Sequence, residues 1–268
     1  MSVLAIALYL AVGAAAGLLA GLLGVGGGLV IVAALAWMLP SQGVPAAAVM
    51  HVALATSLAS ILATSLSSSR AHCKRGAVMW PTVRSLVPGL LLGGVLGAVL
   101  AGRLPDALLR LGVAGFCFIA ALQLATRRTP PDHGDAVVPQ GRGLTAWGGV
   151  IGAVSALVGI GGGSLTVPLL IQRGARPVHA VGTSAACGFA IALAAAAGYA
   201  WGGRDVAGMP DGSFGYIHLP AAGAIALASV VLAPAGAALA HRLRGAVLQR
   251  VFAGFLAAMG TAVLAAAL

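Results

Sequence analysis

The sequence predicts an all-α polytopic membrane protein made of two homologous halves, each with about four apolar segments. The first observation behind this prediction is composition, since 60% of the 268 residues are hydrophobic and only 7% are charged. A soluble domain carries roughly 25% charged residues. The second is that uncharged runs of about 20 residues, long enough to cross a bilayer, follow one another along the chain. The third is a glycine-rich stretch that occurs twice, at 24–28 and at 159–163.

The apolar segments fall into two matching sets on either side of a polar linker. Residues 1–126 form the first membrane repeat, residues 127–142 the linker and residues 143–268 the second repeat. The expected segments are 3–39, 45–69, 77–101 and 105–126, followed by 143–172, 178–201, 215–240 and 245–267. When the halves are aligned, Gly24 corresponds to Gly159. This internal duplication is a common plan among transporters.

Each glycine stretch interrupts the first apolar segment of its half. Four glycines in five residues disfavour a helix by roughly 1 kcal/mol each relative to alanine. In a bilayer the helix satisfies the backbone polar groups, so a break is tolerated only where protein or a water-filled cavity covers it. We therefore expect two broken or re-entrant helices, with the functional site at the breaks. Other glycines, such as Gly93 and Gly94, are expected to serve close helix packing.

The placement of lysine and arginine favours an inverted repeat. If each broken segment crossed the membrane, the 15 basic residues would divide eight to seven between the two sides. If each segment folds back as a hairpin, twelve lie on one side, and the other side holds only Arg103, Arg110 and Arg204. Because basic residues concentrate in cytoplasmic loops, the hairpin arrangement predicts both termini outside and the 127–142 linker in the cytoplasm.

A helix that begins just after a glycine break is suited to bind an anion. Its first N–H groups are unpaired, and the helix dipole places partial positive charge there. Glycine lets a ligand approach the backbone closely. In an inverted repeat the two breaks are expected to face each other near the midplane, with nearby hydroxyls adding hydrogen bonds. The predicted binding residues are Gly26, Gly27, Gly28, Gly161, Gly162, Gly163, Ser164, Thr166, Thr56, Ser57, Thr183 and Ser184.

These motifs resemble a known family over essentially the whole chain. The repeated Gly-x-Gly-Gly-Gly, the later small-Thr-Ser tripeptide and the two sets of four segments resemble the sulfite exporter TauE/SafE family. The second half is the closer match and includes Pro168, whereas the first half has Ala33 where that proline would fall. The resemblance implies a multi-pass permease of the bacterial inner membrane that moves small anions, such as sulfite or organosulfonates.

Residue types that are missing limit the chemistry. The sequence has no glutamate, and its five aspartates lie at segment ends or in loops, so a buried carboxylate for sodium or proton coupling is not expected. Three widely spaced cysteines predict neither a disulfide nor a metal site. We expect no cofactor and no catalytic residues. The expected partners are a small anionic substrate and the lipid bilayer, and not nucleic acid, because the basic residues sit at segment ends and in loops.

Several alternatives stay open at this level. A passive anion channel needs a continuous pore, which the sequence alone does not distinguish from a carrier. A membrane-embedded enzyme or assembly factor handling a sulfur compound or a lipid is disfavoured, because no acid, base and nucleophile set lies within the apolar segments. A homodimer is also left open. Valine at Gly27 or Gly162 is expected to block transport without preventing membrane insertion.

Overall fold

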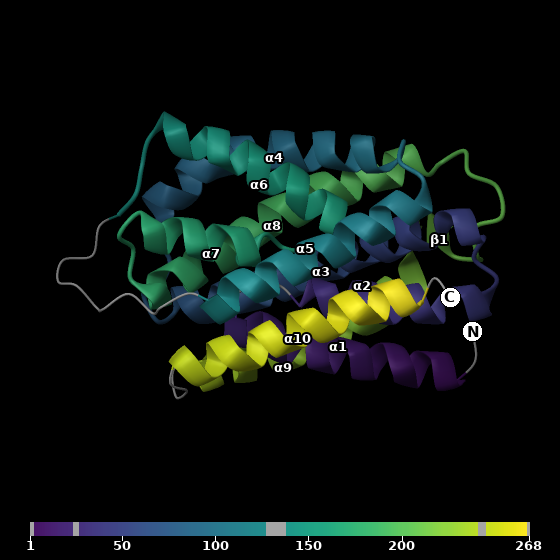
Figure 1. Ribbon diagram of the computed structural model, residues 1–268, viewed down its shortest axis with the longest axis horizontal. Helices are drawn as coiled ribbons and strands as arrows, with labels where there is room; N and C mark the ends of the chain where they lie inside the picture. The colour runs from purple at the N-terminus through teal and green to yellow at the C-terminus, as the bar shows by residue number, and fades with distance from the viewer. Residues whose placement is uncertain (1–2, 24–26, 127–137, 241–244, 267–268) are drawn as a thin grey trace.

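The computed structural model describes residues 3–23, 27–126, 138–240 and 245–266. These residues form a bundle of ten α-helices with one short β-hairpin (Figure 1), which confirms the predicted all-helical fold class. The elements are α1 (Val3–Leu23), α2 (Gly28–Met38), the 3-10 helices η1 (Pro40–Gln42) and η2 (Ala46–Ala48), α3 (Val49–Cys73), α4 (Trp80–Ala101), α5 (Asp106–Thr126), α6 (Arg142–Val158), α7 (Gly163–Gln172), α8 (Pro177–Gly202), β1 (Ser213–Phe214), β2 (Ile217–His218), α9 (Leu219–Ala240) and α10 (Gly245–Ala265).

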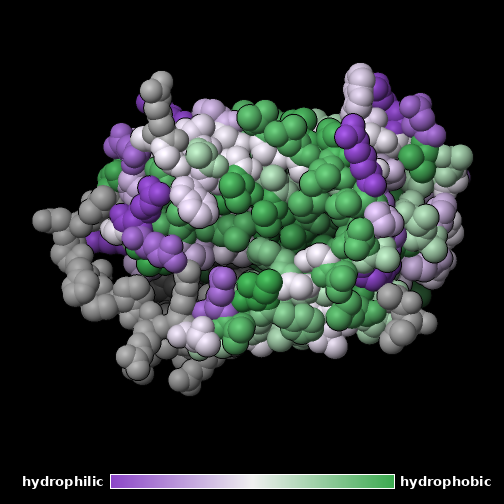
Figure 2. Space-filling view, turned by 45° about the horizontal axis from the view of Figure 1, so that its top comes forward, coloured by the Kyte–Doolittle hydropathy of each residue, from purple (hydrophilic) through white to green (hydrophobic). Residues whose placement is uncertain are grey.

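The surface of the bundle is that of a membrane protein. Among the described helices, α1, α3, α4, α5, α8 and α9 are long and apolar enough to cross a bilayer. A broad hydrophobic band lies between two hydrophilic ends of the molecule (Figure 2). The four tryptophans, Trp37, Trp80, Trp147 and Trp201, are exposed and lie near helix ends. Tryptophan gathers in this way at the two membrane–water interfaces, so the chain is a multi-pass membrane protein.

Helices α3 and α8 form the centre of the bundle. In each of them 72% of the spanning window is buried, against 28% in α1 and 33% in α9. The two central helices pack against each other, α9 also packs on α3, and α4 also packs on α8. The outer helices form the pairs α1 with α9, α4 with α6, and α5 with α10. Residues on α3 and α8 therefore lie at the centre of the bundle.

Glycine allows the outer helices to pack with their backbones in contact. Gly89, Gly93 and Gly97 recur every four residues along the face of α4 that meets α6. A Cβ atom at Gly97 would lie 2.5 Å from the carbonyl oxygen of Ala153, and one at Gly93 would meet the carbonyl oxygen of Gly149. Small residues at this spacing bring membrane helices together. The interpretation of Gly93 as a packing residue is confirmed.

Helices α2 and α7 run back along the helices that precede them. The hydroxyl of Tyr9, near the start of α1, donates a 2.6 Å hydrogen bond to Gln42 Oε1, just beyond the end of α2. At the second break, Leu144 at the start of α6 and Leu170 near the end of α7 belong to one hydrophobic cluster. Figure 1 shows α1 beginning and α10 ending at one end of the bundle, while α3 and α7 end at the other. Both broken segments are therefore hairpins.

The segment expected at 215–240 begins differently from the prediction. A β-hairpin of β1 and β2 comes first, and α9 starts only at Leu219. Gly212 and Gly215 have positive φ angles of 82° and 58°, which L side chains rarely adopt and which suit a tight turn. The hairpin buries Tyr216 inside the bundle, so its apolar composition reflects burial in protein and not the start of a span.

An ion pair between a buried arginine and a partly buried aspartate fixes the start of α5, and its loss should destabilise the protein. Asp106 Oδ2 lies 3.0 Å from an Arg110 guanidinium nitrogen, and Oδ1 accepts a 2.6 Å hydrogen bond from the backbone N–H of Met50. Asp106→Ala leaves the Arg110 charge buried without its partner, which costs about 3–5 kcal/mol. We expect a clearly lower melting temperature in detergent than for Arg103→Gln, an exposed neighbour. Equal melting temperatures would contradict this role.

Candidate functional site

The two glycine breaks touch each other at the centre of the bundle. A Cβ atom at Gly28 would meet the carbonyl oxygen of Gly159 and lie 3.0 Å from Ile160 Cα. The Ser57 hydroxyl on α3 lies 2.8 Å from the carbonyl oxygen of Gly159 and 3.2 Å from that of Gly28. The expectation that the breaks face each other is thus met, and Ser57 ties both of them to the central helix.

Left-handed glycines shape both breaks. Gly27 has φ 67° and is the N-cap of α2, while Gly162 has φ 74° and is the N-cap of α7. The carbonyl of Gly162 accepts hydrogen bonds from Leu165 and Thr166, at 3.1 and 2.8 Å. These bonds close the first turn of α7. The N–H groups that precede them in the chain have no hydrogen-bond acceptor within the helix. Gly26 lies outside the described residues.

Three hydroxyl groups are buried around the second break without a hydrogen-bond partner. They belong to Ser164 and Thr166 in the first turn of α7 and to Ser155 in α6. The Ser155 oxygen lies 3.3 Å from the position that a Cβ atom at Gly162 would occupy. A buried hydroxyl normally finds a partner. These groups therefore offer hydrogen bonds to a ligand, and Ser155 is one that sequence reasoning missed.

Three of the predicted hydroxyls have hydrogen-bond partners within the protein, namely that of Ser57, whose bonds are described above, and those of two threonines. Thr56 Oγ1 accepts a 3.0 Å hydrogen bond from the backbone N–H of His218, just before α9. Thr183 Oγ1 accepts a 3.0 Å bond from the N–H of Met79, the N-cap of α4. Each threonine thus anchors the start of an outer helix on a central one, and because its oxygen only accepts in this contact, its O–H group can still donate a hydrogen bond.

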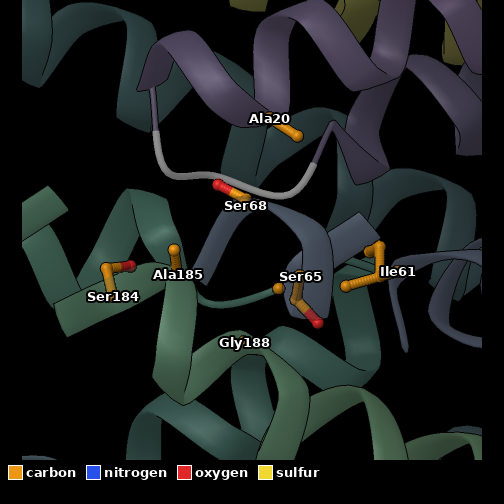
Figure 3. A pocket seen from close by; sticks show the side chains of 8 residues that line it. Ala20, Ile61, Ser65, Ser68, Ser184, Ala185 and Gly188 are labelled. Carbon is orange, nitrogen blue, oxygen red and sulfur yellow. The ribbon is translucent and has the colours of Figure 1, made fainter. Parts of the chain in front are cut away.

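A small cavity lies between α1, α3 and α8, beside the second break. Figure 3 shows Ser65 and Ser68 on α3 opposite Ser184 and Gly188 on α8. The Ser68 hydroxyl is buried and has no partner. The cavity has room for about one water molecule, so an anion requires it to widen. Its lining consists of Ala20, Ile61, Ser65, Ser68, Gly161, Ser184, Ala185 and Gly188.

Aromatic and histidine side chains fill the bundle at the end where α1 begins. The His51 and Tyr216 rings stack with their centroids 5.0 Å apart, and His51 Nε2 lies 3.1 Å from the carbonyl oxygen of Ala101. His218 follows Tyr216 in the hairpin and is also buried. Burial lowers the pKa of His218, which favours the neutral imidazole at physiological pH. These buried side chains close the bundle at this end.

A helical membrane bundle with two broken helices meeting at its centre is typical of multi-pass membrane transporters. The sequence matches the family described as sulfite exporter TauE/SafE over residues 9–263. The chain therefore belongs to the sulfite exporter TauE/SafE family. Because this family consists of transporters, the predictions of a membrane transporter and of a protein that is not an enzyme are confirmed.

Bacterial relatives carry a matching description. A probable membrane transporter protein of Haemophilus influenzae is 37% identical over 256 residues, which cover 94% of this chain and 95% of the relative. A probable membrane transporter protein of Xylella fastidiosa (strain Temecula1) is 30% identical over 141 residues, 50% of this chain and 53% of the relative. No solved structure matches the chain.

Proposed function

We propose that this transporter carries a small anion, sulfite or an organosulfonate, across the bacterial inner membrane and binds it where the two glycine breaks meet. The observation that carries the proposal is the set of buried, unpartnered hydroxyls of Ser155, Ser164 and Thr166 at the N-terminus of α7. A helix N-terminus attracts negative charge, and the hydroxyls add hydrogen-bond donors. The family description names sulfite as the cargo of its exporters.

The helix contacts support an inverted repeat, in which each helix of the first half corresponds to the helix five places later. Helix α1 packs on α9 as α6 packs on α4, and α2 packs on α3 as α7 packs on α8. The side-chain bonds follow the same rule, because Thr56 holds the start of α9 and Thr183 holds the start of α4. In such repeats the substrate site lies near the midplane, between the halves.

The positions of the basic residues support a cytoplasmic location for the end where α3 and α7 terminate. Arg70, Lys74 and Arg173 lie at or near these helix termini, and Arg103 and Arg204 lie at the opposite end. We expect single cysteines at Lys74 and Arg173 to react with a membrane-impermeant thiol reagent only from the cytoplasm. A cysteine at Arg103 should react from outside. If Lys74 and Arg173 report opposite sides, the hairpin topology is wrong.

The cavity supports a carrier mechanism. Its lining residues Ala20 and Ser68 lie toward the ends of α1 and α3 that point to the proposed cytoplasmic side. At the other end, the stacked rings of His51 and Tyr216 block the route. We infer that an anion enters beside Ser68 and reaches the first turn of α7. Release on the far side then requires the β-hairpin and the start of α3 to move apart, which is alternating access and not a continuous pore.

Transport by the purified protein in liposomes tests the proposal. We expect the reconstituted protein to move radiolabelled methanesulfonate across the liposome membrane. Movement of the label should be faster when unlabelled methanesulfonate is present on the opposite side. Flux should not require sodium, because neither break contains an aspartate or a glutamate. Exchange acceleration distinguishes a carrier from a passive channel. Failure of folded protein to move methanesulfonate or sulfite would overturn the proposed function.

A further inference from the structure

The first turns of the two re-entrant helices differ in chemistry although they match in position. After the first break the sequence Leu29-Val30-Ile31 follows Gly28, and after the second break Ser164-Leu165-Thr166 follows Gly163. Aligned on the break glycines, Ile31 occupies the position of Thr166, and both residues are fully buried. Only the second break therefore presents hydroxyl groups in its first turn.

The second break has three unpartnered hydroxyls, two in the first turn of α7 and one on α6 close to Gly162. Thr166 and Ser155 have no exposed surface, and neither hydroxyl has a hydrogen-bond partner. Ser164 contributes a third buried oxygen without a partner. Together with the first N–H groups of α7, these donors match an anion that offers several acceptor oxygens. The corresponding turn of α2 has no side-chain donors.

The charge available at this site is small. A helix N-terminus contributes a partial charge of about +0.5, and the three hydroxyls are neutral. In the described parts of the chain, the buried arginine is Arg110, which pairs with Asp106 beside the start of α3. The buried histidines, His51, His72 and His218, lie outside the first turn of α7. A second negative charge on the ligand would thus be desolvated without a compensating cation, which is strongly unfavourable.

From these observations we propose that the first turn of α7, with Ser155, is the binding site for a singly charged oxyanion, and that the α2 break is not an equivalent second site. The inference rests on the proposed function and narrows the substrate to anions that carry one negative charge. Monoanions such as methanesulfonate or hydrogen sulfite are accepted. Dianions such as sulfate are rejected, although their oxygens resemble those of a sulfonate.

A matched pair of valine variants tests which break binds the ligand. Thr166→Val removes the hydroxyl at nearly constant volume, and Ile31→Val changes the corresponding buried position without touching a polar group. We expect the dissociation constant for methanesulfonate, measured by calorimetry on purified protein, to rise about tenfold or more in Thr166→Val. Ile31→Val should change it less than about twofold. Ser155→Ala serves as a second variant if Thr166→Val does not purify as a single species.

Sulfate competition tests the charge state, and flux separates the two proposals. At equal concentration, sulfate should leave methanesulfonate binding unchanged. Two results would overturn the inference. One is an equal loss of methanesulfonate binding in Thr166→Val and Ile31→Val, and the other is competition by sulfate as strong as by unlabelled methanesulfonate. In either case, flux in liposomes would still support the transport function. Selective loss of binding in Thr166→Val without wild-type flux would leave the site standing and overturn the function. Absence of both binding and flux would overturn both.

Discussion

Gly162→Val should abolish transport while leaving the protein folded. Gly162 has a φ of 74°, and a side chain there meets the Ile191 Cδ1 atom and lies 3.3 Å from the Ser155 hydroxyl. Ile191 Cδ1 is the end of a flexible side chain and can move, but the branched side chain then occupies the space in front of α7. The torsional strain costs about 1–3 kcal/mol, which a folded bundle can tolerate. We expect methanesulfonate flux in liposomes to fall about a hundredfold or more, equivalent to at least about 2.7 kcal/mol.

Two controls separate blocking of the site from general damage. Gly223→Val in α9 makes the same chemical change at a position with no neighbouring atoms within 4 Å, and it should transport normally. Gly94→Ala places a Cβ atom 2.9 Å from Ala194 Cβ in the packed interface between α4 and α8. That variant should melt at a lower temperature and keep its affinity. If Gly162→Val and Gly94→Ala lose stability in parallel and both keep their affinity, the break is only a packing device.

Gly27→Val should prevent folding, in contrast to the expectation from sequence that this variant inserts normally. A Cβ atom at Gly27 would meet the backbone carbonyl oxygen of Ala16 in α1. Unlike a side chain, this backbone cannot turn away, so the hairpin of α1 and α2 must open. We expect little monodisperse protein in size-exclusion chromatography after detergent extraction.

Gly43→Val is the control for Gly27→Val. Gly43 has a φ of 83°, similar to the 67° of Gly27, but no atom lies within 4 Å of its Cβ position. The variant therefore carries the torsional strain alone, about 1–3 kcal/mol, and should purify with a modestly lower melting temperature. If both variants purify equally well, the contact between Gly27 and α1 is not essential for folding.

Features that depend on periodicity and charge could be predicted from the sequence. The segments expected at 77–101 and 105–126 correspond to α4 and α5 within a few residues. The hairpin form of the broken segments followed from basic residues, because a fold-back moves Arg173 and Arg176 to the side that already holds Arg70. The meeting of the breaks was predicted on the assumption of an inverted repeat. Each of these inferences uses a property that the bilayer imposes along the chain.

The partners of individual hydroxyls could not be predicted in this way. Thr56 and Thr183 were expected to face the ligand, and the structure adds that their oxygens accept bonds from backbone N–H groups just before α9 and α4, which no local pattern predicts. Ser155 and Ser68 lie in helices where a serine ordinarily bonds the carbonyl one turn earlier, so nothing local marks them as free. Only the packing of α1, α3, α6 and α8 decides which hydroxyls are left without partners around the second break.

The position of a bound anion tests the central claim most directly. Bromomethanesulfonate is a singly charged oxyanion whose bromine scatters X-rays anomalously. In a crystal soaked with it, the anomalous difference map therefore gives the position of the ligand directly. We expect the bromine peak next to the first turn of α7, with the sulfonate oxygens within hydrogen-bond distance of Thr166 and Ser155, and no peak of similar height at the first turn of α2. A peak at the α2 break, at the helix ends or between other helices would contradict the account.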